Sequence, residues 1–104
     1  MSIKLVGKTG SLTGDETYAG GACFSLELVD ANGKPIPASF SIDYSGDDIP
    51  IAAITPYGML VMLVSSADAT KSLAITATPI DGSTATTVNK TIGALIGATV
   101  PSNL

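Results

Sequence analysis

Carboxylates are the residues of this sequence whose spacing comes closest to a chemical site. Asp43, Asp47 and Asp48 crowd the segment "DYSGDD", and Asp15 and Glu16 are adjacent in another polar segment. Oxygen ligands of this kind hold hard cations such as Ca²⁺. The spacing matches no calcium-binding loop, however, and adjacent residues at a strand end point to opposite faces. We therefore expect solvated turn residues, with a cation site as the alternative, and predict no cofactor.

Catalysis has little support in the residue types present. The chain has no His, so it lacks Ser-His and Cys-His pairs and imidazole acid–base groups. The segment "VGKT" at 6–9 resembles the end of a phosphate-binding loop, but that motif requires Gly where this sequence has Ser2. A glycosidase pair would need sugar-stacking aromatic residues, and the chain has three Tyr, two Phe and no Trp. We predict a protein that is not an enzyme.

Composition predicts one folded domain that binds neither nucleic acid nor a membrane. The chain has 104 residues, of which 45% are hydrophobic and 13% charged, which is enough to bury a core without disulfides or metals. The net charge is −4, and the five Lys and Arg residues are spread singly. No basic patch is therefore available for phosphates or for an anionic lipid surface.

Two further features bear on the cellular compartment in which the chain is made. Cys23 is the single cysteine, and its place beside Phe24 predicts a small buried residue rather than a reactive thiol. The N-terminus has no secretion-signal pattern, and the longest apolar region, residues 49–64, is short and interrupted by Pro50, Pro56 and Gly58. We expect a soluble chain that is made without a secretion signal.

The elements that position these residues are predicted to be strands. Apolar residues alternate with polar ones at a period of two, as in Phe24, Leu26 and Leu28, and Gly-, Asn- and Asp-rich turns separate the runs. About seven short antiparallel strands with turns at this spacing predict an all-β, two-sheet sandwich. The expected strands are residues 3–6, 22–29, 38–44, 51–54, 59–64, 72–78 and 84–92.

The segment "LELVDANGKPIP", followed by "ASFSIDY", resembles the bacterial immunoglobulin-like (Big) domains of surface adhesins such as invasin and intimin. Those domains join two strands through Asp-x-x-Gly-x-Pro-(Val/Ile)-Pro, and the later segment 53–92 is similar to their second half. The resemblance implies an immunoglobulin-like β-sandwich over residues 1–92, followed by an apolar, Gly- and Ala-rich tail over 93–104. Turn residues with a structural role are Asp30, Asn32, Gly33, Pro35, Pro37, Asp81 and Gly82.

The run "MLVMLV" departs from the pattern of a strand with one wet face. Met59, Val61 and Leu63 should face one side of the sheet, and Leu60, Met62 and Val64 the other. Both faces would then be apolar, so something should cover the second one. The C-terminal tail and a protein partner, either a second copy or a larger assembly, are equal alternatives.

Two functions fit these features. The first is a structural protein of a tailed-phage virion, a decoration or cement protein of the capsid or tail, assembled in the host cytoplasm as a homo-oligomer. It rests on the recurrence of such domains on virions, a fold-level analogy. The alternative is an adhesin-type binding module from a longer cell-surface protein, a monomer that binds through loops 46–50 and 10–21.

Overall fold

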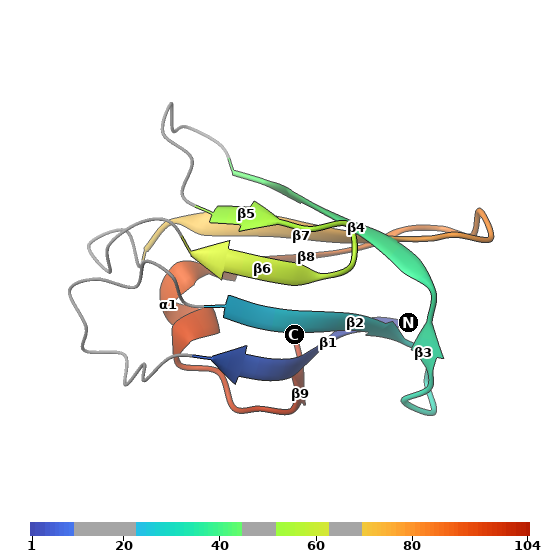
Figure 1. Ribbon diagram of the computed structural model, residues 1–104, viewed down its shortest axis with the longest axis horizontal. Coiled ribbons are helices and arrows are strands. Elements are labelled where there is room, and N and C mark those ends of the chain that lie inside the picture. The colour runs from blue at the N-terminus through green and yellow to red at the C-terminus, as the bar shows by residue number, and fades with distance from the viewer. Residues whose placement is uncertain (10–22, 45–51, 63–69) are drawn as a thin grey trace.

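The protein consists of two antiparallel β-sheets packed face to face. The computed structural model describes residues 1–9, 23–44, 52–62 and 70–104, apart from the side chain of Met62. Figure 1 shows one sheet in front of the other, with a short helix at one end of the sandwich. The predicted all-β sandwich is confirmed.

The larger sheet, sheet A, has the strand order β5-β6-β2-β1-β9, with β3 paired to β2, and the smaller sheet, sheet B, has the order β4-β7-β8. Every pairing is antiparallel. The elements are β1 (Ser2–Thr9), β2 (Cys23–Val29), β3 (Pro35–Ile36), β4 (Ala38–Asp43), β5 (Ala52–Ile54), β6 (Met59–Met62), β7 (Ser72–Pro79), β8 (Thr86–Thr91), α1 (Ile92–Ile96) and β9 (Ser102–Asn103).

This connectivity is that of an immunoglobulin-like domain. Without the two-residue strands β3 and β9, seven strands remain, and they divide as the first, second, fifth and fourth against the third, sixth and seventh. Constant-type immunoglobulin domains divide their strands in the same way. All seven predicted strands are present, and the structure adds β3, α1 and β9.

The core lies between the sheets and is entirely apolar among the described residues. Buried and more exposed residues alternate along the strands of both sheets, as predicted. On β2 of sheet A, Phe24, Leu26 and Leu28 point inward, and on β7 of sheet B, Leu73 and Ile75 do the same. Each fully buried side chain of this size contributes about 1.5–3 kcal/mol. The remaining buried members of the main cluster are Ile3, Leu5, Phe40, Ala52, Leu60, Ala77, Ile92, Leu95 and Ile96.

The last residues of the chain close one side of this sandwich. Helix α1 follows β8 directly, with the Thr91 hydroxyl accepting a hydrogen bond from the Ala94 N–H (3.1 Å) as its N-cap. The helix places Ile92, Leu95 and Ile96 in the core. After a cis Val100–Pro101 peptide bond, β9 pairs with β1, and the Leu104 N–H donates to the Ile3 carbonyl (2.8 Å). The segment that the sequence separates as a tail thus contains core residues.

A bulge in β1 turns Lys8 toward this C-terminal segment. The register of β1 against β2 shifts between Leu5 and Gly7, so that Lys8 lies opposite the buried Phe24. Its Nζ donates to the carbonyls of Ile96 (2.8 Å) and Ala98 (3.2 Å), just where α1 ends. A cation at this place satisfies carbonyls that the helix leaves without partners.

The turn between β5 and β6 connects the two sheets. The Leu26 N–H of β2 donates to the Gly58 carbonyl (2.8 Å), and the Phe40 N–H of β4 donates to the Pro56 carbonyl (3.1 Å). Gly58 has φ +94°, and a Cβ built on it would lie 2.5 Å from the Leu26 carbonyl oxygen and 3.2 Å from Phe40 Cε2. Only glycine allows both this backbone conformation and this approach.

We predict that Gly58→Ala lowers the free energy of unfolding by about 2–5 kcal/mol. The left-handed conformation costs about 1–2 kcal/mol, and overpacking against β2 and Phe40 adds about 1–3 kcal/mol. Gly82→Ala is the matched control, because Gly82 also has a positive φ (+85°) but nothing lies within 4 Å of its added Cβ. Urea unfolding should give a loss of only about 1–2 kcal/mol for that variant. Equal losses at both positions would contradict the role of the close approach.

We predict that Leu95→Ala destabilises the protein by about 2–5 kcal/mol, because it leaves a cavity in the core. Thr99→Ala, at an exposed position of the same segment, should change the unfolding free energy by no more than about 0.5 kcal/mol. Urea denaturation of the two variants measures the difference. A neutral Leu95→Ala would mean that the C-terminal segment is not part of the cooperative unit.

Candidate interaction surfaces

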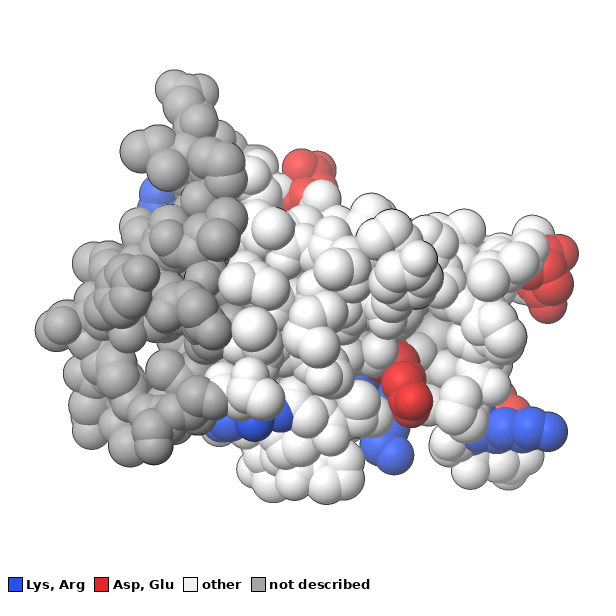
Figure 2. Space-filling view, viewed as in Figure 1, with Lys and Arg blue, Asp and Glu red and all other residues white. Residues whose placement is uncertain are grey.

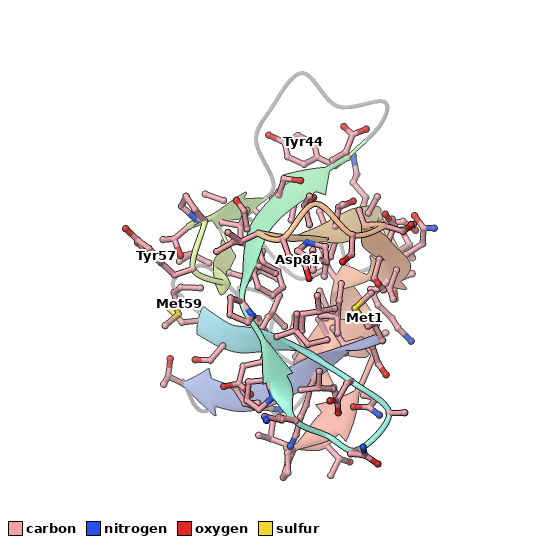
Figure 3. All side chains as sticks on the ribbon, turned by 90° about the vertical axis from the view of Figure 1, so that its right-hand side faces the viewer. Met1, Tyr44, Tyr57, Met59 and Asp81 are labelled. Carbon is pink, nitrogen blue, oxygen red and sulfur yellow. The ribbon has the colours of Figure 1, made fainter. Side chains whose placement is uncertain are left out.

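The outer face of sheet A carries an uncharged surface, which we call the β6 face: Cys23, Ser25, Ala53, Tyr57, Met59 and Val61. Cross-strand pairing brings most of it together, since Cys23 and Ala53 both lie opposite Val61, and Ser25 lies opposite Met59. Met59 is 39% exposed and Tyr57 89% exposed. Figure 3 shows the Tyr57 and Met59 side chains projecting from the same side of the molecule.

The six residues of the "MLVMLV" run fall into three groups. Leu60 is fully buried and belongs to the core, whereas Met59 and Val61 lie on the outer face. The side chain of Met62, and residues Leu63 and Val64, lie outside the described part of the chain. The C-terminal segment does not cover Met59, because β9 joins sheet A beyond β1, on the far side of β2.

The position of Cys23 corrects the expectation of a buried residue. Cys23 is only partly buried and lies on the outer face, because the next residue, Phe24, takes the core position. In the sequence, Tyr57 is marked only by the glycine that follows it, which indicates a turn. Its exposure depends on how that turn is held between the sheets, and no sequence pattern reports it.

The outer face of sheet B has the opposite character. Its strands present hydroxyl and amide groups such as Ser39, Ser41, Thr78 and Asn89, and the Thr76 and Thr87 hydroxyl groups hydrogen-bond each other across β7 and β8 (2.9 Å). Figure 2 views the sheet A side: its centre is uncharged, and basic and acidic side chains lie along the lower border. Next to the β6 face on sheet A, Lys4 of β1 lies directly opposite Glu27 of β2.

The turns that the sequence singles out lie at the end of the sandwich opposite α1 (Figure 1). In residues 30–34, the Asp30 carboxylate accepts hydrogen bonds from the backbone N–H groups of Lys34 and Asn32 (2.9 Å each). These bonds lower the pKa of Asp30 below its ordinary value. Gly33 has φ +79°, as the turn requires. Pro35 and Pro37 flank Ile36 at the crossing from sheet A to sheet B.

The β7–β8 turn repeats this arrangement. The Asp81 carboxylate accepts from the Ser83 hydroxyl and from the Ser83 backbone N–H (2.8 Å), and both bonds lower the pKa of Asp81. Gly82 has φ +85°. Beside this turn a shallow groove of about 240 Å³ is lined by Ile36, Pro37, Ile80 and Asp81.

The acidic residues that the sequence offers as a possible cation site form no such site in the described parts of the chain. Asp43 is exposed at the end of β4, and Asp15, Glu16, Asp47 and Asp48 lie outside the described residues, as do loops 10–21 and 46–50. Across the described parts of the chain, no three His, Cys, Asp or Glu residues are grouped to hold a metal. No helix within those parts is long and apolar enough to cross a membrane.

Comparisons with protein-family models, with curated proteins and with solved structures gave no match. The candidate surfaces therefore rest on the chain's own geometry.

We predict that the two Asp turns make stability depend on acidity. Because the folded pKa values of Asp30 and Asp81 lie below the ordinary value of 3.8, their contribution is present above that pH and is lost as the pH falls through the folded values. The double variant Asp30→Asn/Asp81→Asn keeps an oxygen acceptor in each turn but cannot titrate. Urea midpoints between about pH 5 and pH 2 should fall less steeply for it than for the parent protein. Identical slopes would contradict this role.

Proposed function

We propose that this protein is a non-enzymatic structural module that works through protein–protein contacts, as a decoration or cement protein of a tailed-phage virion. The observation that carries the proposal is the β6 face, an uncharged and partly apolar surface on one side of a sandwich whose other side is covered by hydroxyl groups. The virion setting, and assembly in the host cytoplasm, rest on the resemblance to bacterial immunoglobulin-like domains.

The β6 face has the composition of the centre of an interface. Tyr and Met are enriched in such centres, and charged residues are depleted there. Burying the apolar parts of Tyr57, Met59 and Val61 would gain about 25 cal/mol for each Å² removed from water. Burying the β6 face removes no charged group from water. Burying the outer face of sheet B would instead remove water from many hydroxyl groups.

The border of this face suits a second copy of the chain. Lys4 and Glu27 lie side by side on neighbouring strands. In a two-fold packing of two β6 faces, each Lys4 can approach the other copy's Glu27, because such an interface uses the same patch twice. Opposite charges at the rim favour this register and offset the mutual repulsion of two chains with a net charge of −4.

The test of the proposal is the solution mass by light scattering over a dilution series. We expect concentration-dependent association of the parent chain, and we expect Met59→Lys to weaken it by at least about ten-fold, since burying an unpaired charge in an interface costs more than about 1.4 kcal/mol. Ser41→Lys adds the same charge to the outer face of sheet B and should leave association unchanged.

The control separates the effect of the β6 face from that of net charge. Equal weakening by both Lys variants would mean that the added charge alone acts and that the β6 face is not the contact. A parent chain that stays monomeric at every concentration would overturn self-association and would leave only contacts with a different protein.

A further inference from the structure

We propose that the groove formed by Ile36, Pro37, Ile80 and Asp81 is a second docking site, and that it receives a protein segment presenting one aliphatic side chain next to a Lys or Arg. This end groove lies at the turn end of the sandwich and shares no residue with the β6 face. The inference therefore goes beyond the proposed function and does not depend on it.

The size of the end groove favours a side chain over a small-molecule ligand. Its volume is about 240 Å³, below the roughly 300–1,000 Å³ typical of small-molecule sites. One aliphatic side chain with part of its backbone is thus the occupant that fits.

The walls of the end groove are apolar and held in place. Ile80 is 74% exposed, so its side chain is available for contact with a partner. Its N–H donates to the Pro37 carbonyl (3.1 Å), which fixes the β7–β8 turn against the crossing from β3 to β4. Prolines on either side of Ile36 restrict the backbone there. Such a preformed surface loses little conformational entropy on binding.

The negative charge of Asp81 at the rim of the end groove favours a basic residue next to the bound aliphatic side chain. Among the residues that the structure describes, Asp81 is the only charged one that lines the end groove. Its carboxylate is oriented by the Ser83 hydroxyl and N–H groups (N–H to Oδ1, 2.8 Å). In Figure 3, which looks at this end of the molecule, Asp81 lies near the centre of the view, away from Tyr57 and Met59. A Lys or Arg beside the bound aliphatic side chain would complement it, in keeping with the chain's net charge of −4.

The probe is a capped tetrapeptide, acetyl-Gly-Leu-Arg-Gly-amide, titrated into the isotope-labelled full chain and followed by amide NMR shifts. We expect saturable shifts at Ile36, Ile80, Asp81 and Gly82, with a dissociation constant of about 1–10 mM, as expected for so small a ligand. Replacing the peptide's Leu by Ala, or its Arg by Glu, should weaken binding several-fold. If no localised shifts are seen, or if the Glu peptide binds as well as the Arg peptide, the proposal is wrong.

Variants of the protein complete the test. Asp81→Asn keeps the acceptor for Ser83 and should weaken binding about two- to five-fold, in the range of an exposed ion pair. Ile80→Ser should weaken it at least about five-fold, while an unchanged urea midpoint shows that the fold is intact. Met59→Ser is the matched control on the β6 face and should leave the titration unchanged. An effect of Met59→Ser equal to that of Ile80→Ser would place the peptide elsewhere and overturn the assignment.

Discussion

The close approach of the β5–β6 turn to the two sheets is the constraint on which the rest of the structure depends. Its carbonyl groups at Pro56 and Gly58 accept hydrogen bonds from β4 of one sheet and β2 of the other. Gly58 is buried against the Leu26 carbonyl. The turn therefore fixes how the sheets sit on one another at that end. It also determines that Tyr57, at the tip of the turn, is exposed beside Met59 (Figure 3).

The two outer faces of the sandwich differ in character. Both sheets bury side chains on their inner face, and this burial does not require the outer faces to differ. Sheet B follows the rule for an antiparallel sheet with one wet face, with hydroxyl and amide groups outward. Sheet A breaks that rule at β6, where Met59 and Val61 face outward on a strand whose Leu60 is already in the core. Among the described residues, none covers Met59 completely, since it remains 39% exposed, and we propose a protein contact at this surface.

Local sequence rules predict burial and turns well where a residue's environment is set by its neighbours in the chain. A period of two along β2 and β7 indicated which side chains would be buried. The pairs Asn32-Gly33 and Asp81-Gly82 marked turns, and both of these glycines have a positive φ. Lys8 is an exception to these rules. A strict period of two along β1 would place Lys4 and Lys8 on the same face of the sheet. The bulge in β1 places Lys8 on the other face instead, against the end of α1.

The sequence by itself determined the fold class of this protein: an all-β sandwich of about seven strands, the turns between them, and the absence of His-based chemistry. Alternation and turn propensity are local properties, and a residue and its near neighbours are enough to express them. Only the tertiary structure decided which face of β6 is open, that Ile92, Leu95 and Ile96 enter the core, that β9 pairs with β1, and that Ile36 and Ile80 form one groove. Each of these depends on contacts between residues far apart in the chain, which become neighbours only when the two sheets pack.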